Sequence, residues 1–376
     1  MNAGVSGSRN AAMLTPGSVI GILGGGQLGR MTAIAASRLG YKVAVLSAGP
    51  DDPAVAVAHR HIQASFDDRE ALAELATYAD VVTYELEQLP LEPVVWLAER
   101  VPVAPGTFVL ETAQDRIREK TFFGKVGIPT VPWQAITSRD AVVAAIDAIG
   151  RPAIFKVAYG GYDGKGQKAI EEGDADADLF AIWDRLSNGR EMTAIAEQKV
   201  FFDCELSVIV ARDRQGNMVT YDPALNVHRN HILNTTTVPA PAEKFVLDTA
   251  REMVCKLANG LDYVGVLCLE LFLMPDGALL ANEIAPRPHN SGHWTLDACY
   301  TDQFEQLVRA IAGLPLGDAR RFVDVRMENI IGPDGADISR YLEAPNAKLH
   351  LYGKHEIRPG RKMGHVTHLY TNNETD

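Results

Sequence analysis

A glycine-rich turn between a predicted strand and a predicted helix constrains the fold of this chain more than any other segment. Residues 18–23 ("SVIGIL") are rich in β-branched side chains, and Gly24, Gly26 and Gly29 follow in the spacing G-x-G-x-x-G. Residues 28–40 then carry apolar side chains at helical spacing. A strand–turn–helix unit of this kind directs free backbone N–H groups at an anion. The pattern predicts a doubly wound α/β domain with a parallel sheet.

Further strand–helix units follow the turn, and an antiparallel region follows them. Residues 42–47 and 80–86 have strand composition, with a predicted helix over residues 67–78 between them. A predicted helix ending at Gly127 then leads into strand pairs joined by turn signals, which is typical of α+β structure. We therefore expect a disordered leader, an α/β domain, an α+β domain and a small C-terminal domain, over residues 1–17, 18–114, 115–318 and 319–376.

The glycine turn alone does not identify a dinucleotide site. A nicotinamide-binding unit carries Asp or Glu at the end of its second strand, where the carboxylate holds the ribose. Ser47 occupies that position, and Asp51 lies beyond the Gly49–Pro50 turn. The sequence therefore favours an anion site at the turn over a tight turn that binds nothing, and it disfavours NAD binding.

A second glycine-rich segment, "GGYDGKGQ" at residues 160–167, follows a lysine on an apolar strand. Lys156 comes directly after Ile154 and Phe155. Glycine-rich loops bring backbone N–H groups close to phosphate oxygens, and lysines neutralise their charge. The pattern G-x-x-x-x-G-K-[ST] is absent from the sequence. The segment predicts a nucleotide site of another class, against the alternative of a solvated turn.

The segment "LELFLMPDGALLANE", residues 269–283, predicts a hairpin that brings two carboxylates together. If Asp276–Gly277 is a two-residue turn, Glu270 lies directly opposite Glu283. Like charges in such positions destabilise a sheet unless a cation compensates them. Two carboxylates on apolar strands are typical of a magnesium site that also holds phosphates. A longer turn would shift the register and leave each glutamate in solvent.

Two polar clusters and a second hairpin add candidate residues. The segments "NEIAPRPHNSGHWT" and "KHEIRPGRKMGH" concentrate histidines and basic residues near the C-terminus. The first is typical of a site loop, against the alternative of a structural buried histidine. The second suits a phosphate pocket or a solvated basic face. A turn at Gly216–Asn217 would bring Glu205 opposite His228, although Pro223 interrupts that run.

The composition excludes several classes of protein. The net charge of −12 argues against nucleic acid and anionic membranes as partners. No apolar run is long enough to cross a bilayer. The four cysteines are widely spaced and contain no C-x-x-C pair, which predicts reduced thiols and a cytoplasmic location.

Together these segments resemble the ATP-grasp superfamily, and within it the 5-(carboxyamino)imidazole ribonucleotide synthase family of purine biosynthesis. The resemblance covers nearly the whole chain after the leader. It rests on "GGGQLGRM", "TYELE", "GGYDGKGQ", "NEIAPRPHNSGHWT" and "RPGRKMGH", in the order of the family. It implies a Rossmann-like N-terminal domain, a central ATP-grasp fold, a small C-terminal domain and a homodimer.

The resemblance also implies a reaction. ATP, with Mg²⁺ or Mn²⁺, would phosphorylate bicarbonate to carboxyphosphate, and the carboxyl group would pass to the amine of 5-aminoimidazole ribonucleotide. An ATP-grasp ligase or carboxylase with another acceptor is the nearest alternative. A silent nucleotide-binding module is a second, although the intact Lys156, Glu270 and Glu283 argue against it.

Residue roles follow from the same resemblance. The metal would be held by Glu270 and Glu283, and catalysis would involve Lys156, Arg287 and His293. ATP would contact Arg116, Lys156, Gly161, Tyr162, Asp163, Gly164, Lys165, Gly166, Gln167, Glu197, Gln198, Lys199, Val200, Glu205, His228, Asn282 and Glu283. The ribonucleotide would contact Gln27, Glu85 or Glu87, Asn290, Ser291, Lys354, Arg361 and Lys362.

Three positions depart from the pattern of the family. Ala158 and Tyr159 stand where two basic residues are common, and His231 stands where glycine is common. The first departure bears on how the substrate phosphate is held, and the second on the loop beside His228.

Overall fold

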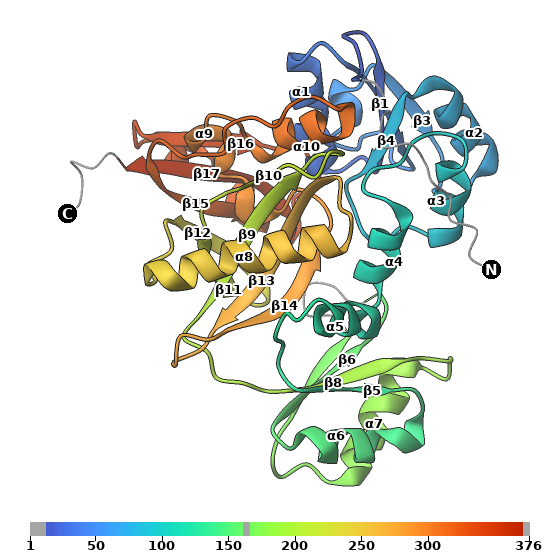
Figure 1. Ribbon diagram of the computed structural model, residues 1–376, viewed down its shortest axis with the longest axis vertical. Helices are drawn as coiled ribbons and strands as arrows, with labels where there is room; N and C mark the ends of the chain where they lie inside the picture. The colour runs from blue at the N-terminus through green and yellow to red at the C-terminus, as the bar shows by residue number, and fades with distance from the viewer. Residues whose placement is uncertain (1–12, 161–165, 371–376) are drawn as a thin grey trace.

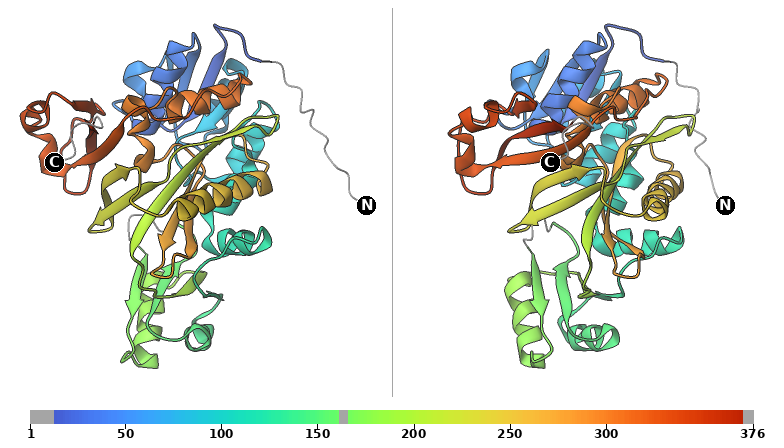
Figure 2. Two further views of the ribbon diagram at one scale, coloured as in Figure 1. Left: turned by 60° about the vertical axis from the view of Figure 1, so that its left-hand side comes forward. Right: turned by 90° about the vertical axis from the view of Figure 1, so that its left-hand side faces the viewer.

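The structure, a computed structural model, describes residues 13–160 and 166–370. An upper body combines the N-terminal sheet with a long antiparallel layer of strands, and a small subdomain projects below it (Figure 1). The C-terminal strands lie on the side of the body away from the N-terminal helices α2 and α3, as the rotated views make clear (Figure 2). The expected combination of a Rossmann-like domain, an ATP-grasp fold and a small C-terminal domain is confirmed.

The N-terminal domain contains a four-stranded parallel sheet in the order β3-β2-β1-β4. Its strands are β1 Val19–Leu23, β2 Lys42–Ser47, β3 Arg60–Gln63 and β4 Val81–Tyr84. Its helices are α1 Gln27–Arg38, α2 Arg69–Tyr78, α3 Leu91–Ala98 and α4 Thr107–Gln114. The sequence predicted every strand except β3, which is short and carries only one buried side chain, Ile62.

Helix termini in this half of the chain are fixed by aspartates. Asp68 begins α2 by accepting hydrogen bonds from the backbone N–H groups of Glu70 and Ala71. Asp115 does the same for α5, Arg116–Lys125. The single helix expected across this stretch is therefore wrong, because the extended backbone at Asp115 separates α4 from α5.

The projecting subdomain has a four-stranded antiparallel sheet in the order β5-β8-β6-β7, with two helices. Its elements are β5 Trp133–Ile136, α6 Val142–Ile149, β6 Ala153–Val157, β7 Gln167–Ile170, α7 Asp176–Ser187 and β8 Ala194–Gln198. It has a core of its own, in which Phe155 and Trp183 pack edge to face. Its separate core lets it pack as a unit against the rest of the molecule.

The largest sheet joins the central and C-terminal parts of the chain, in the order β14-β13-β9-β11-β12-β15-β17-β16, with β10 beside β9. Its central strands are β9 Cys204–Arg212, β10 Met218–Thr220, β11 Ala224–Arg229, β12 Ile232–Val238, β13 Gly265–Leu273 and β14 Leu279–Ala285. The C-terminal strands are β15 Asp324–Ile331, β16 Ala347–Leu351 and β17 Lys362–Tyr370. Pairing of β12 with β15 makes the C-terminal strands a continuation of the same sheet.

Helices cover this sheet and connect it to the N-terminal domain. They are α8 Lys244–Gly260, α9 Thr295–Ala298, α10 Gln303–Ala312 and the short α11 Ser339–Leu342. One continuous core includes Met31 of α1, Leu307 of α10 and Met327 of β15. Burial of apolar surface therefore holds the N-terminal, central and C-terminal parts together.

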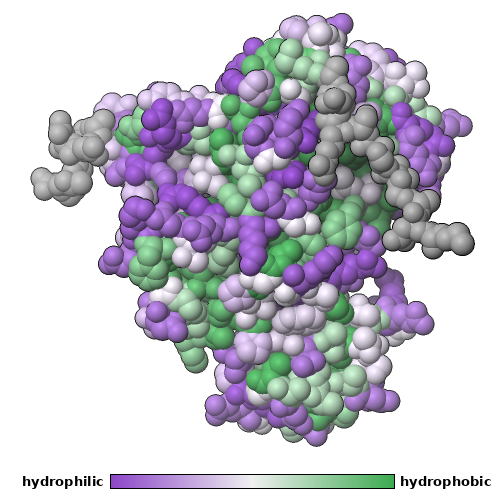
Figure 3. All heavy atoms as spheres, viewed as in Figure 1, coloured by the Kyte–Doolittle hydropathy of each residue, from purple (hydrophilic) through white to green (hydrophobic). Residues whose placement is uncertain are grey.

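The surface carries both polar and apolar side chains. Hydrophilic and hydrophobic side chains alternate over the face drawn in Figure 3. Within residues 13–160 and 166–370, no helix is both long and apolar enough to cross a membrane.

Candidate active site

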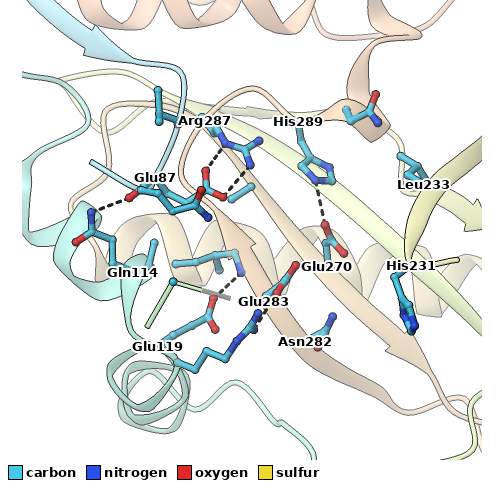
Figure 4. A pocket seen from close by; sticks show the side chains of 18 of the residues that line it. Glu87, Gln114, Glu119, His231, Leu233, Glu270, Asn282, Glu283, Arg287 and His289 are labelled. Carbon is cyan, nitrogen blue, oxygen red and sulfur yellow. Dashed lines mark hydrogen bonds and ion pairs between the residues drawn. The ribbon is translucent and has the colours of Figure 1, made fainter. Parts of the chain in front are cut away.

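One large cavity, about 640 Å³, lies where the parts of the molecule meet. Its wall includes Gln27 of the N-terminal domain, Lys156 of the small subdomain, Glu283 of the large sheet and Lys362 of the C-terminal strands. The close-up shows side chains from several elements pointing into one space (Figure 4). A single cavity thus collects groups that are far apart in the sequence.

The glycine turn borders this cavity, but the anion at its N–H groups belongs to the protein. The Glu85 carboxylate accepts hydrogen bonds from the backbone of Gly26 and, at 2.7 Å, of Gly29. A Cβ atom at Gly24 or Gly26 would lie only 2.4 or 2.6 Å from Glu85. The glycines therefore make room for this carboxylate at the start of α1. Because Glu85 occupies these N–H groups, they are not available to the phosphates of a nicotinamide dinucleotide in this arrangement.

The β13–β14 hairpin differs from the expected register near its turn and returns to it at the glutamates. Leu273 pairs with Leu279 and Met274 bonds Ala278, so the loop has three residues and the two-residue turn was wrong. A bulge between Leu269 and Leu271 then restores the expected pairing of Leu269 with Ile284. As a result Glu270 and Glu283 line the same cavity.

Each of these two carboxylates is paired through one oxygen. Arg116 lies 2.9 Å from Oε2 of Glu283, and His289 lies 3.0 Å from Oε1 of Glu270 (Figure 4). Among the described residues, Oε1 of Glu283 and Oε2 of Glu270 have no hydrogen-bond donor. Within the same residues, no group of three or more His, Cys, Asp or Glu side chains is placed to hold a metal ion. The donor set is therefore two free carboxylate oxygens.

His289 is a cavity residue that the sequence analysis did not assign to the site. Its Nδ1 lies 2.8 Å from Oγ of Ser291, which accepts a 2.7 Å hydrogen bond from Ser207. Burial disfavours the charged ring, but Cys268 and Glu270 outweigh burial and raise the pKa of His289 to about 10. Burial raises and His289 lowers the pKa of Glu270, with a net decrease. The signal in the sequence was the position of His289 in the segment "NEIAPRPHNSGHWT", which is typical of a site loop.

Arg287 connects the N-terminal domain to the large sheet. Its Nε and Nη2 donate to the two oxygens of Glu87 at 2.5 and 3.0 Å. Both side chains line the cavity and point toward each other (Figure 4). Burial opposes the charge of Glu87, but Arg287 holds the pKa of that carboxyl below its usual value. This bidentate pair fixes one cavity wall across two domains.

Lys156 is held by a buried glutamate rather than standing free. Glu197 lies between Lys156 and Lys120, with 2.8 Å to the latter, and Lys120 is 1% exposed. Burial raises the pKa of Glu197, but the two lysines lower it to about 2. Lys120 also donates to the carbonyl of Asn282 at 2.9 Å. The cluster links the small subdomain to the large sheet and orients Lys156.

His228 and Glu205 form the ion pair that the sequence suggested, by a different register. The loop after Arg212 has five residues before Met218, so the turn expected at Gly216–Asn217 was wrong. In the sheet, Glu205 pairs with Asn226, and His228, two residues further along β11 on the same face, reaches the Glu205 carboxylate diagonally. Burial lowers and Glu205 raises the pKa of His228, with a net increase.

His293 lies away from the cavity, in a histidine cluster beneath the C-terminal strands. The cluster consists of His293, His350 and His365, with ring centroids 4.8 Å apart for His293 and His365. His293 is 1% exposed, and burial holds its pKa well below the usual value. Its Nδ1 lies 3.1 Å from Nε2 of Gln303. This placement supports a packing role for His293, whose expected part in catalysis stays a prediction.

The C-terminal basic residues reach the cavity to different extents. Lys362 lines the cavity, whereas Lys354 and Arg361 are not part of its wall. Burial and nearby Arg361 lower the pKa of Lys354 to about 8. Lys354 donates to the carbonyl of Lys362 at 2.8 Å, so its ammonium group lies beside the cavity-lining residue.

Asn290 has a buried amide without a protein partner. The residue is 9% exposed and lines the cavity, and neither Nδ2 nor Oδ1 has a hydrogen bond within the described residues. Buried polar groups are normally satisfied, so this amide provides one donor group and one acceptor for a bound molecule.

The cavity wall includes many of the residues named from the sequence: Gln27, Glu85, Glu87, Arg116, Lys156, Gln167, Glu205, His228, Glu270, Asn282, Glu283, Arg287, Asn290 and Lys362. Other described members of that set lie off the wall: Gly166, Glu197, Gln198, Lys199, Val200, Ser291, His293, Lys354 and Arg361. Gly161, Tyr162, Asp163, Gly164 and Lys165 lie outside the described residues. The wall also includes Gln114, Glu119, His231 and His289, which the sequence did not place there.

Three family models match successive parts of the chain. They are the ribonucleotide synthetase preATP-grasp domain over residues 18–114, the ATP-grasp domain over 121–304 and the phosphoribosylaminoimidazole carboxylase C-terminal domain over 326–375. The chain is 49% identical over 356 residues to the N5-carboxyaminoimidazole ribonucleotide synthase of Brucella melitensis, covering 95% of this chain and 97% of the relative.

Solved structures agree with the sequence matches. The N5-carboxyaminoimidazole synthetase of Staphylococcus aureus complexed with ADP is similar with a TM-score of 0.91 at 36% identity, covering 98% of this chain and 97% of that one. The synthase of Aspergillus clavatus in complex with ADP and 5-aminoimidazole ribonucleotide gives a TM-score of 0.85 at 31% identity, covering 94% of both chains. The chain therefore belongs to the N5-carboxyaminoimidazole ribonucleotide synthase family of ATP-grasp enzymes.

Proposed function

We propose that this protein uses ATP and bicarbonate to carboxylate the exocyclic amine of 5-aminoimidazole ribonucleotide. Bicarbonate attacks the γ-phosphorus of ATP, which gives carboxyphosphate and ADP. The amine then attacks the carboxyl carbon, inorganic phosphate leaves, and the amine loses a proton. The product is the N5-carboxyamino ribonucleotide of purine biosynthesis. The family membership and the bound ligands of the two solved relatives support this reaction.

The site at Glu270 and Glu283 suits a magnesium or manganese ion bound together with nucleotide phosphates. Mg²⁺ in such sites takes one or two carboxylates and completes its shell with phosphate oxygens and water. The free oxygens of Glu270 and Glu283 fit this requirement. When bound, the ion offsets the charge that spreads over the transferring oxygens. Arg116, paired with Glu283, and Lys156 add positive charge on the same wall.

The bicarbonate and the amine are best accommodated between Arg287, His289 and Asn290. These three follow β14 directly and line the cavity beside the carboxylate pair. Arg287 is locked by Glu87, so its remaining N–H groups have a fixed direction. The unpaired amide of Asn290 supplies both a donor and an acceptor for a carboxylate. His289, with Nδ1 at Ser291 and Nε2 at Glu270, is placed to hold a proton near the reacting amine.

The observation that carries the proposal is the shared wall of one cavity. Gln27 and Glu87 come from the N-terminal domain, the carboxylate pair from β13 and β14, and Lys362 from the C-terminal strands. A reaction that brings together a nucleotide, bicarbonate and a phosphorylated amine needs binding groups from each of these parts of the molecule. The carboxyphosphate intermediate hydrolyses readily, and a cavity enclosed by several domains limits its contact with water.

The deciding experiment is ADP release from MgATP with each substrate omitted in turn. We expect fast release only when both bicarbonate and 5-aminoimidazole ribonucleotide are present. Release that is indifferent to the ribonucleotide would assign the enzyme to another acceptor. A Glu283→Gln variant serves as the inactive control, and Mn²⁺ in place of Mg²⁺ tests the metal requirement.

The proposal extends to the assembly and its location. The family resemblance implies a homodimer, which sedimentation equilibrium would test directly. Cys204, Cys255, Cys268 and Cys299 are free thiols, which agrees with a reducing cytoplasmic environment.

A further inference from the structure

The hairpin between β11 and β12 contains a residue in an unfavourable backbone conformation. Arg229 pairs with Ile232, so the turn consists of Asn230 and His231 alone. Both have positive φ, 51° and 62°, as in a type I′ turn. Glycine suits this left-handed region best, and asparagine and histidine adopt it at a modest cost. The turn would be more stable with glycine at position 231.

The strained residue faces the proposed nucleotide site. His231 lines the cavity, whereas its neighbour Asn230 does not. Figure 4 places the His231 side chain in the same space as Glu270 and Asn282, the end of the cavity where the carboxylate pair lies. Strained conformations of this kind are concentrated at ligand sites.

The charges on the wall set His231 apart from the other basic groups. Ion pairs engage the following five: Arg116 with Glu283, Lys156 with Glu197, His228 with Glu205, Arg287 with Glu87, and His289 with Glu270. Lys362 also has a partner. Within the described parts of the chain, His231 is thus the basic residue of the wall whose side chain has no hydrogen bond or ion pair. Its ring is available to an anion.

We propose that His231 binds the phosphate chain of the nucleotide and so raises the affinity of this enzyme for ATP. The inference rests on the proposed function, because it assumes that the triphosphate lies along the Glu270–Glu283 pair. A ring N–H group beside that pair meets phosphate oxygens, and a hydrogen bond to a charged oxygen is stronger than one to a ribose hydroxyl. The strain in the turn is retained because glycine would remove this contact.

The test compares two glycine substitutions in the same turn. His231→Gly relieves the strain and removes the ring, and Asn230→Gly changes the adjacent left-handed residue while leaving His231 in place. Calorimetric titration would give Kd for ATP, ADP and adenosine. We expect His231→Gly to weaken ATP and ADP roughly tenfold, which is the effect of about 1.4 kcal/mol. Adenosine should bind within about twofold of the parent, and Asn230→Gly should match the parent for all three ligands.

Stability provides an independent measurement on the same variants. His231→Gly should fold and melt at the same temperature as the parent or higher, since glycine is favoured at this position. Equal ATP affinity in His231→Gly and the parent, or an equal loss for ATP and adenosine, would overturn the phosphate contact. A parent enzyme whose ADP release ignores the ribonucleotide would instead refute the proposed function, so the two failures are distinguishable.

Discussion

His289 and His293 lie in one short segment but in opposite electrostatic environments. His289 faces the cavity, contacts Glu270 at 3.0 Å, and has a pKa raised to about 10. His293 packs in the histidine cluster against His365 and Phe304, and its pKa is far below the usual value. Little of either side chain is exposed, 14% for His289 and 1% for His293. The acidic neighbours of His289, Cys268 and Glu270, and not the depth of burial, therefore decide which histidine is charged.

The two histidines thus mark two regions of the molecule: the cavity proposed to be the active site, and the packed interior that supports it. The cavity wall around His289 contains several ion pairs. A bound ligand can contact their charged groups in place of the present partners. The histidine cluster holds the neutral rings of His293 and His365 where the C-terminal strands pack on the central helices, with His365 bonded to Tyr352 at 2.8 Å. Substitutions in the two regions should consequently affect different measurements.

The largest effect is expected for Arg287→Ala on the cavity wall. Removing Arg287 leaves the half-buried Glu87 carboxylate without its partner, which costs up to about 3–5 kcal/mol, the cost of breaking a buried pair. Urea unfolding measures the loss. Arg60→Ala, which removes an exposed pair with Glu74, is the control and should cost less than about 1 kcal/mol. Equal losses in the two variants would contradict the role of Arg287 in joining the domains.

Glu270→Gln should reduce turnover strongly with less effect on stability. It removes a proposed metal ligand and the carboxylate that keeps His289 charged, and we expect a loss of at least about 100-fold in kcat. ADP release in the presence of both substrates measures it. Glu305→Gln changes a paired, partly buried carboxylate outside the cavity and should stay within about twofold.

His293→Asn should show the reverse pattern. The loss of ring packing in the histidine cluster should lower the free energy of unfolding by about 1–3 kcal/mol. Turnover per folded molecule should remain within about twofold of the parent, because His293 does not line the cavity. His289→Asn is the matched variant in the other region. A specific loss of turnover in His293→Asn, with stability unchanged, would show that His293 takes part in the reaction.

The smallest expected effect is an opposite pH dependence of the two regions. His293 and His365 have lowered pKa values when folded, so the unfolded chain binds more protons and stability falls as pH drops below about 6.5. His289 has a raised pKa when folded, so its stabilisation is complete below about pH 6.5 and disappears as pH rises through about 10. Unfolding from about pH 5 to about pH 10 should show His293→Asn flattening the acid side and His289→Asn the alkaline side. Equal slopes of the unfolding free energy against pH in the two variants would contradict the difference in charge between His289 and His293.

Much of the fold could be predicted because local patterns specify it. The strands β1, β2 and β4 and the helices between them follow from apolar periodicity and a capping aspartate. The exposed strand β3 carried too little of that pattern to be recognised. The break at Asp115 was missed, although the Asp115 side chain caps the second helix.

The site was predicted by residue type more reliably than by geometry. The hairpin placed Glu270 and Glu283 on a common wall, yet the turn has an extra residue that a bulge compensates. Glu205 and His228 meet as diagonal neighbours on β9 and β11, because Glu205 pairs with Asn226. His289 was left out and His293 chosen because nothing local distinguishes two histidines in one loop.

The sequence by itself determined strands β1, β2 and β4, helices α1 and α2, and the chemical types at the carboxylate pair, because each depends on neighbours a few residues apart. The tertiary structure alone decided that Glu85 occupies the glycine turn, that the histidines differ in charge, and that His231 faces the cavity. Each of these depends on segments brought together from distant parts of the chain. Burial and charge pairing, which set pKa and ligand access, exist only once those segments have packed.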